Sequence, residues 1–241
     1  MRDSYLTRGE GKDLVLLHGY LASKESFYPQ IEYFSRYFRV TAPDFPGMGG
    51  AEALEAAWSV DDYADWTNEF LARRGIEFPH VIAHSFGGRV AVKLLSRGEC
   101  FDRAVLTGCA GIIPKRGIKY KLRVRAYRIA KKLAPEYAEK KFGSAEYRTL
   151  SPVMRESYKK IVNEDLREQA KLITRPVLFL HGERDTETPL SSAQVYASCV
   201  KGSRLNVLEN CGHFAFLDDP LLFNLAAEEF FICRHPKTIS F

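Results

Sequence analysis

The sequence predicts an α/β fold with a mostly parallel central sheet and helices on both faces. Short strand-like runs alternate with longer amphipathic stretches, which is the pattern of parallel strands joined by crossover helices. The chain has 241 residues, a length that is short for two full domains but sufficient for a buried core without disulfides or a structural metal. We therefore expect one central sheet.

The strands and helices of this pattern can be placed along the chain. Buried-strand composition occurs at Leu14–Leu17, Phe38–Ala42, His80–Ala83, Ala104–Thr107, Val177–Leu180 and Leu205–Leu208. A helix is expected to open at Ser59, because Asp62 follows at the spacing of a capping box. Further helices are expected directly after Ser85, near Ser191 and after Pro220.

The alternation of strands and helices is interrupted once. Residues 110–172 contain no strand-like run and consist of helix-like sequence rich in Lys, Arg and Tyr. About 60 residues are few for an independent core. We therefore expect residues 1–109 and 173–241 to form the sheet domain, and residues 110–172 to form a helical lid inserted between two of its strands.

Positive charge is concentrated in this expected lid. Between Lys115 and Lys141, eleven Lys and Arg stand against two Glu, a local charge of +9 in a chain whose net charge is +5. An apolar stripe with helical spacing runs through the same segment, at Leu122, Ala126, Ile129, Ala130 and Leu133. The combination predicts a basic amphipathic helix.

Three roles for this basic helix remain open. Its apolar stripe can pack over a binding site while the charges are simply solvated. The charges can instead steer an anionic small-molecule substrate, such as an acidic ester or an acyl-CoA, or rest on an anionic membrane surface, the less favoured role. A salt titration separates the first role from the other two, because salt screens both steering and lipid binding. Nucleic acid is not an expected partner, since the helix lacks interleaved aromatic residues and a recognisable reader module.

The cysteines and the apolar runs bear on the cellular compartment. Five widely spaced cysteines form no CxxC pair, which argues against a disulfide framework or a zinc ribbon and fits a reducing compartment. No run approaches the ~20 apolar residues of a membrane span, and the first residues lack the apolar core of a signal peptide. We expect a cytoplasmic protein; nothing in the sequence determines an oligomeric state.

Ser85 is the strongest candidate for a chemical role. A buried-strand pattern runs into Ala83-His84-Ser85-Phe86-Gly87-Gly88 and continues as a helix. This is the Gly-x-Ser-x-Gly arrangement of a nucleophile elbow, with Ala83 in place of the first glycine. Small residues are needed two positions before and after the serine, where we expect them to be pressed together. The helix that follows directs its positive end toward an anion developing at the serine.

An acid and a histidine follow the last two predicted strands. Asp185 lies in His181-Gly182-Glu183-Arg184-Asp185, and His213 lies in Gly212-His213. The order Ser85, Asp185, His213 is the chain order of a Ser-His-Asp triad on a doubly wound sheet. Because the carboxyl ends of parallel strands share one edge, we expect all three side chains there.

An oxyanion hole completes the expected machinery. His18-Gly19-Tyr20 follows the first strong strand, in the loop that supplies one backbone N–H, and the residue after the nucleophile supplies the other. These are the amides of Tyr20 and Phe86, whose side chains are free to line the acyl pocket. The turn-rich run from Asp44 to Gly49 ends at the same edge, where we expect it to shape the site.

Together these motifs resemble the α/β-hydrolase superfamily, in its small esterase-like branch, over about Lys12 to Phe231. The resemblance rests on His18-Gly19, Asp44-x-Pro46-Gly47-x-Gly49, the serine elbow, His181-Gly182-x-x-Asp185 and Gly212-His213. It implies the α/β-hydrolase fold, with a small helical lid inserted after the sixth strand. The serine at the elbow distinguishes the chain from haloalkane dehalogenases and epoxide hydrolases, which carry an aspartate there.

The function implied is hydrolysis of a carboxylic ester or thioester by Ser85, His213 and Asp185, through an acyl-enzyme. No cofactor is required, and no metal site is expected, because the histidines lack ligand spacing and four of the six lie at the strand ends. The loop after His18 has no run of consecutive glycines. In this respect it resembles the oxyanion loop of short-chain esterases and of C–C bond hydrolases. The absence of the glycine run disfavours bulky tertiary-alcohol esters as substrates. The alternatives are therefore a C–C bond hydrolase for a vinylogous diketone, or a non-catalytic ligand-binding member of the fold.

Overall fold

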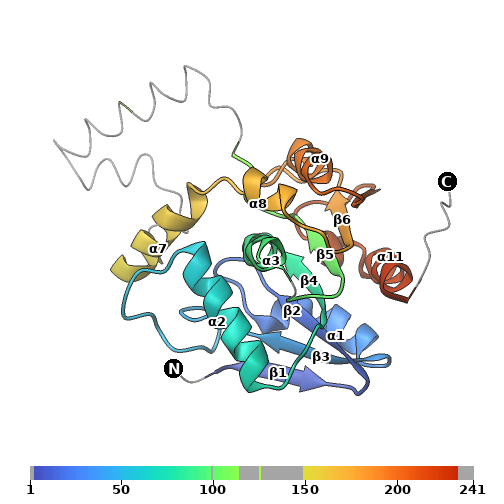
Figure 1. Ribbon diagram of the computed structural model, residues 1–241, viewed down its shortest axis with the longest axis horizontal. Coiled ribbons are helices and arrows are strands. Elements are labelled where there is room, and N and C mark those ends of the chain that lie inside the picture. The colour runs from blue at the N-terminus through green and yellow to red at the C-terminus, as the bar shows by residue number, and fades with distance from the viewer. Residues whose placement is uncertain (1–2, 99, 114–124, 126–148, 233–241) are drawn as a thin grey trace.

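A seven-stranded sheet organises the chain in the computed structural model, which describes residues 3–98, 100–113, 125 and 149–232 (Figure 1). The strands are β1 (Tyr5–Arg8), β2 (Lys12–Leu17), β3 (Phe38–Pro43), β4 (His80–His84), β5 (Ala104–Thr107), β6 (Val177–Gly182) and β7 (Arg204–Leu208). Their spatial order is β1-β3-β2-β4-β5-β6-β7, so β4 is the central strand. All neighbours pair in parallel except β1, which pairs antiparallel with β3 at one edge.

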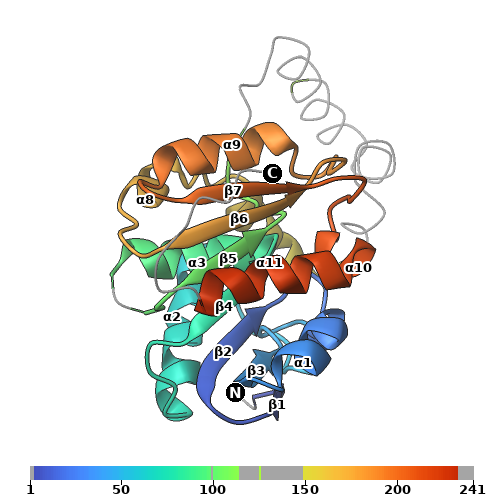
Figure 2. The ribbon, with the colours of Figure 1, turned by 90° about the vertical axis from the view of Figure 1, so that its right-hand side faces the viewer.

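Helices cover both faces of the sheet (Figure 2). One face carries α1 (Tyr28–Phe34) and α11 (Pro220–Ile232), which contact each other over a core that includes Phe34, Phe223 and Phe231. The other face carries α2 (Val60–Arg73), α3 (Phe86–Ser96), α8 (Arg167–Lys171) and α9 (Leu190–Cys199). The remaining helices are η1 (Lys24–Phe27), α7 (Pro152–Val162) and α10 (Ala215–Asp218). Apolar side chains of β2, β4, β5 and β6 are buried on both faces, as expected for central parallel strands.

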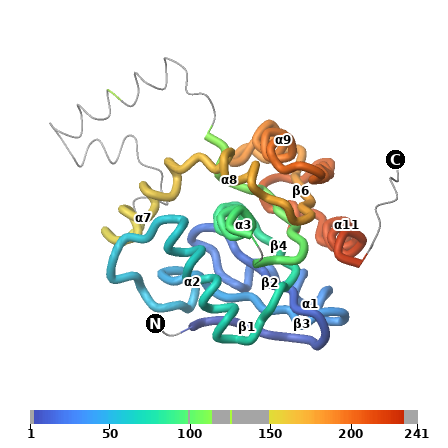
Figure 3. The backbone as a smooth tube through the Cα atoms, viewed as in Figure 1, coloured from blue at the N-terminus to red at the C-terminus, as the bar shows by residue number. Residues whose placement is uncertain are grey.

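The predicted elements are largely confirmed, with small extensions at the strand ends. The helix at Ser59 has the full capping box, since the Ser59 hydroxyl accepts from the Asp62 amide and the Asp62 carboxylate accepts from the Ser59 amide. Strand β1 was not expected, because its four residues are all exposed and present no apolar run. The tube in Figure 3 shows it beside β3, near the start of the chain.

The 110–172 segment leaves the sheet after β5, and not after a sixth strand as the resemblance implied. Five strands, β1 to β5, precede this segment in the structure, because β1 alone comes before the strand that begins at Lys12. Within the described part of this segment, the chain forms α7 and α8 and no strand. Apart from Arg125, the basic amphipathic helix expected over 122–133 lies outside the described residues, as do residues 114–121 and 134–148 of the expected lid.

No helix among the described residues combines the length and apolarity needed to cross a bilayer.

Candidate active site

Ser85 lies between the central strand β4 and helix α3, at the carboxyl edge of the sheet. Its backbone adopts φ 51° and ψ −106°, a conformation that costs an L-residue about 1–3 kcal/mol and persists only where neighbours enforce it. The enforcing bonds come from the next strand and the chain beyond it: the Ser85 amide donates to the Thr107 carbonyl at 3.1 Å, and the Ala110 amide donates to the Ser85 carbonyl at 3.2 Å. The turn therefore has the strained geometry of a nucleophile elbow.

Gly87, the small residue two positions after Ser85, is required by its close approach to the chain at the end of β2. A Cβ added to Gly87 would lie 2.2 Å from the carbonyl oxygen of Leu17 and 2.8 Å from that of His18. The end of β2 is therefore a close neighbour of Gly87. This packing places the first turn of α3 directly against the loop that contains Tyr20.

His213 and Asp185 are joined at the same edge of the sheet. His213 Nδ1 lies 2.8 Å from Asp185 Oδ2, and the carboxylate also accepts from the Thr188 hydroxyl and from the amides of Glu187 and Thr188. Burial alone would raise the pKa of Asp185, but the hydrogen bonds from His213 and Thr188 outweigh it and lower the pKa to about 2. A carboxylate that stays ionised keeps the proton of neutral His213 on Nδ1 and leaves Nε2 as a base.

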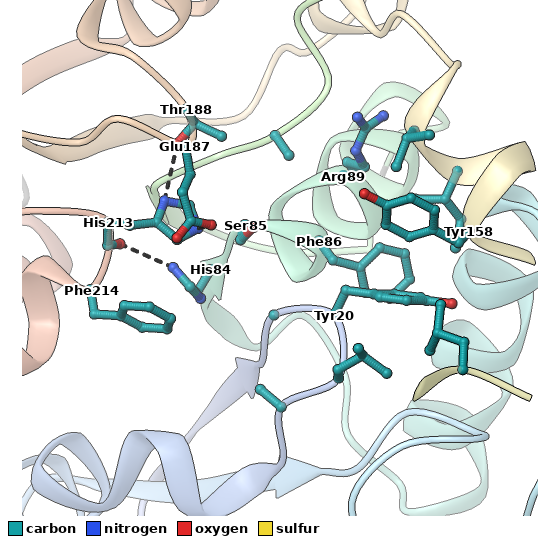
Figure 4. Close-up of a pocket in the computed structure, with 17 residues that line it drawn as sticks. Tyr20, His84, Ser85, Phe86, Arg89, Tyr158, Glu187, Thr188, His213 and Phe214 are labelled. Atoms are coloured by element: carbon teal, nitrogen blue, oxygen red, sulfur yellow. Dashed lines mark hydrogen bonds and ion pairs between the residues drawn. The ribbon is translucent and has the colours of Figure 1, made fainter. Parts of the chain in front are cut away.

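Two further histidines hold this arrangement without exposing a ring to solvent. His84 is buried, and its Nε2 donates to the main-chain carbonyl of His213 at 3.1 Å (Figure 4). Burial lowers the pKa of His84 to about 3, so the ring is neutral. His181 is also buried, and its Nε2 donates to the carbonyl of Thr188 at 2.9 Å, which secures the loop that carries the acid.

The loop after β2 is secured by a third buried histidine, His18. Its Nδ1 donates to the Gly19 carbonyl at 2.7 Å, and its Nε2 accepts from the Phe45 amide at 3.0 Å. Burial lowers the pKa of His18 to about 4, which fits an uncharged ring that both donates and accepts. The bond to Phe45 ties this loop to the turn-rich run, where the Asp44 carboxylate is buried and accepts from Ser4, Lys24 and Gly50. The run therefore has a structural role.

Ser85 and His213 line a common pocket of about 620 Å³ (Figure 4). Tyr20 and Phe86 also line it, with their rings edge to face at 5.4 Å, and Tyr20 donates its hydroxyl proton to the Met154 carbonyl of α7. Neither of these two residues' amides donates to another described backbone or side-chain group. The geometry thus brings Asp185 and His213 into direct contact and places Ser85 in the same pocket. Among the described residues, Ser85 Oγ makes no hydrogen bond to His213.

Several pocket residues were not anticipated from the sequence. Helix α7 contributes Tyr158, Ile161 and Val162, which cover the site from within the expected lid. Glu187 lies beside His213, with its Oε2 3.5 Å from His213 Nε2. Arg89, on the first turn of α3 after Ser85, also lines the pocket.

The four histidines at the strand ends are accounted for by these hydrogen bonds. In the portion of the chain that the structure describes, no three His, Cys, Asp or Glu side chains converge in a way that could hold a metal ion.

Residues 14–226 match the family model described as the alpha/beta hydrolase family. The chain belongs to this family. The resemblance inferred from the motifs is thereby confirmed, and so is the expectation that the chain is an α/β-hydrolase enzyme.

Relatives of this hydrolase include named esterases. It is 26% identical over 243 residues to a pimeloyl-[acyl-carrier protein] methyl ester esterase from Nitrosomonas europaea, covering 89% of this chain and 93% of that protein. It is 28% identical to a carboxylesterase from Bacillus subtilis, over 88% of this chain and 77% of the relative. A shorter match, 37% identical over 106 residues, joins 43% of this chain to 40% of the (E)-2-((N-methylformamido)methylene)succinate hydrolase of Acinetobacter baylyi.

Solved structures share the fold of this hydrolase. An esterase from Exiguobacterium antarcticum superposes with a TM-score of 0.77 at 24% identity, covering 95% of this chain and 94% of that one. A meta-cleavage product hydrolase from Pseudomonas fluorescens superposes with a TM-score of 0.73 at 24% identity, over 95% and 93% of the two chains.

Proposed function

We propose that this hydrolase cleaves a carboxylic ester or thioester, with Ser85 as nucleophile, His213 as general base and acid, and Asp185 as the partner of the histidine. The observation that carries the proposal is the 2.8 Å bond from His213 Nδ1 to the ionised Asp185, in a pocket lined by a serine with strained backbone. Hydrolysis by relatives named as esterases supports the same reaction.

In this mechanism His213 Nε2 accepts the Ser85 hydroxyl proton as Oγ bonds to the substrate carbonyl carbon. The carbonyl electron pair moves to the oxygen, and the amides of Tyr20 and Phe86 donate to this oxyanion. When the oxyanion collapses, the bond to the alcohol or thiol breaks and His213 protonates the leaving group. Water then repeats the sequence on the acyl-enzyme, which releases the acid and restores Ser85. Asp185 stays ionised throughout and stabilises the imidazolium.

The proposal extends to the surroundings of the site. Helix α7 acts as the described part of a lid over residues 110–172, which divides the sheet domain into residues 1–109 and 173–241. A cytoplasmic location is supported by the described cysteines, of which Cys100, Cys109, Cys199 and Cys211 are free thiols.

Labelling with a fluorophosphonate probe tests the proposed chemistry. We expect wild-type protein to be labelled, and we expect Ser85→Ala and His213→Ala to lose the label while keeping the wild-type circular dichroism spectrum. Ser96→Ala is the matched control: Ser96 lies at the far end of α3, where its hydroxyl donates to the Lys93 carbonyl, and the variant should label normally.

Two results would contradict the proposal. Folded wild type that takes no label would favour a protein that binds a ligand without catalysis. Equal labelling of Ser85→Ala would assign the reactive hydroxyl to another residue. Once labelling is established, initial rates with an ester, a thioester and a vinylogous diketone identify the bond that is cleaved; turnover of the diketone alone would assign C–C bond hydrolysis.

A further inference from the structure

Arg89 is a buried cation in the wall of the pocket. It lies on the first turn of α3, four residues after the N-cap residue Ser85, and Cα–Cβ bonds in a helix tilt toward its N-terminus, here the end that carries the serine. Only 7% of the residue is exposed, and it lines the pocket. A long charged side chain is rarely buried to this extent without an anionic partner.

No carboxylate from the described residues pairs with Arg89. Its one hydrogen bond runs from Nη1 to the main-chain carbonyl of Glu164, at 2.8 Å, so the donors on Nε and Nη2 bond to no described group. The nearby carboxylates are engaged elsewhere: that of Glu164 pairs with Lys93 at 2.5 Å, and that of Asp165 pairs with Arg167. Burial also lowers the pKa of the Arg89 guanidinium, the direction expected for a charge with too little compensation.

The position of Arg89 relative to Ser85 indicates which part of a substrate it meets. In the proposed reaction His213 protonates the leaving group, which must therefore lie on the His213 side of the serine. Figure 4 shows His213 and Glu187 on one side of Ser85, and Arg89 and Tyr158 on the other. The acyl group consequently extends toward Arg89. Glu187, beside His213, adds negative charge on the leaving-group side.

We propose that Arg89 binds a carboxylate at the far end of the acyl group, so that the substrate is a half-ester or half-thioester of a dicarboxylic acid. This inference rests on the proposed function. A guanidinium binds a carboxylate through two parallel hydrogen bonds, and Arg89 offers that fork with one unit of positive charge, which suits a monoanion better than a phosphate dianion. Arg89 lies on the first turn of the helix that follows Ser85, so a short dicarboxylic acyl group is the one to test.

The preference for a charged acyl end provides a kinetic test. Monomethyl glutarate is compared with methyl 5-amino-5-oxopentanoate, in which a neutral amide replaces the carboxylate at the same size. We expect wild-type kcat/KM to favour the half-ester by about 10- to 100-fold, the usual effect of a hydrogen-bonded charge. Arg89→Gln should bring the ratio of the two kcat/KM values close to one, and Arg89→Lys should retain part of the preference.

A matched variant distinguishes direct contact between Arg89 and the substrate carboxylate from a general effect of positive charge on α3. Lys93→Gln removes the same charge one turn further along α3, at an amine already paired with Asp61 and Glu164, and should keep the wild-type ratio. An equal fall of the ratio in Lys93→Gln and Arg89→Gln, or no wild-type preference, would overturn the inference. Thermal unfolding of each variant shows whether the fold is retained.

A binding measurement keeps this inference separate from the proposed chemistry. Calorimetric titration of the Ser85→Ala protein with monomethyl glutarate needs no turnover, and we expect binding that disappears in Ser85→Ala/Arg89→Gln and persists in Ser85→Ala/Lys93→Gln. Absence of binding in a protein whose wild type reacts with the fluorophosphonate would refute the carboxylate site and leave the hydrolase mechanism standing. Binding without any labelling would reject the mechanism and retain the carboxylate site.

Discussion

The buried ring of His84 donates through Nε2 to the main-chain carbonyl of His213, so the residue before the proposed nucleophile directly supports the residue proposed as its base. The two rings lie with their centroids 4.6 Å apart, and Gly108 also packs against His213, since a Cβ added to Gly108 would lie 3.0 Å from that ring. The orientation of the histidine is thus determined by the central strands as well as by Asp185.

Substitution of His84 should therefore reduce the rate more than it weakens substrate binding. In His84→Phe the ring volume is nearly kept but the hydrogen bond to His213 is lost, and we expect kcat to fall by about 10-fold with little change in KM, the equivalent of roughly 1.4 kcal/mol. Steady-state kinetics on the best ester measures both constants. A rise in KM at unchanged kcat would assign His84 to substrate binding.

Loss of the charge at Asp185 should be far more damaging. In Asp185→Asn the amide no longer requires the Nδ1-protonated tautomer of His213, and kcat should fall by about 10³- to 10⁴-fold. Thr188→Val removes only one of the donors to the same carboxylate and should cost about 10-fold. Single-turnover rates for the two variants test this ranking, which a comparable loss in both would contradict.

The strained backbone of Ser85 predicts a gain in stability when function is removed. Ser85→Gly can adopt φ 51° without a Cβ penalty, whereas Ser85→Ala keeps that penalty. We expect the glycine variant to exceed the alanine variant by about 1 kcal/mol in free energy of unfolding, with both inactive. Urea denaturation measures the difference, and equal stabilities would mean that the turn relaxes at no cost.

The close approach of Gly87 to β2 predicts a strong local effect of one methyl group. Gly87→Ala would place its Cβ 2.2 Å from the Leu17 carbonyl, so α3 must shift, and we expect a loss of about 2–3 kcal/mol and of most activity. Gly75→Ala is the matched control, because its added Cβ contacts nothing within 4 Å. The only expected loss of stability is that of an alanine at positive φ, about 1 kcal/mol. Equal melting temperatures for the two would refute the packing argument.

Burial of neutral His18 predicts a loss of stability in mild acid. The unfolded chain protonates this histidine near pH 6.5 and the folded chain only near pH 4, so the unfolded state binds more protons between these values and stability falls as the pH falls. The loss from His18 alone is about 3 kcal/mol. Urea unfolding at pH 7, 5.5 and 4.5 should show a shallower dependence in His18→Asn; an unchanged slope would contradict the assignment.

The sheet and the order of the proposed triad follow from local patterns, because central parallel strands are apolar on both faces and the carboxyl ends of such strands meet. Strand β1 could not be predicted in this way. Tyr5–Arg8 is an exposed edge strand, stabilised by pairing with β3 and not by a buried face of its own. Chain order also predicted that Ser85, Asp185 and His213 lie together, although 128 residues separate the first and last; the structure joins Asp185 to His213 and places Ser85 in the same pocket.

The residues that line the pocket could not be predicted from local sequence patterns. Tyr158 and Glu187 enter it only because α7 and the loop after β6 pack against the sheet edge, and no periodicity in the chain encodes those contacts. Arg89 resembled any other charged residue of an amphipathic helix until its burial was known. The contact of Gly87 with β2 was missed for a similar reason, since the atoms nearest to an added Gly87 Cβ belong to a strand some 70 residues earlier.

The sheet order also has a consequence for synthesis on the ribosome. Strand β5 pairs on its outer side with β6, and 69 residues lie between Thr107 and Val177. At roughly 5–20 residues per second, translation leaves the outer edge of β5 without its partner for roughly 3–14 s after β5 itself has been synthesised. An unpaired strand edge invites pairing with other chains. During that interval the nascent chain is a natural client for chaperones, and slow translation across the 110–172 segment would lengthen its exposure.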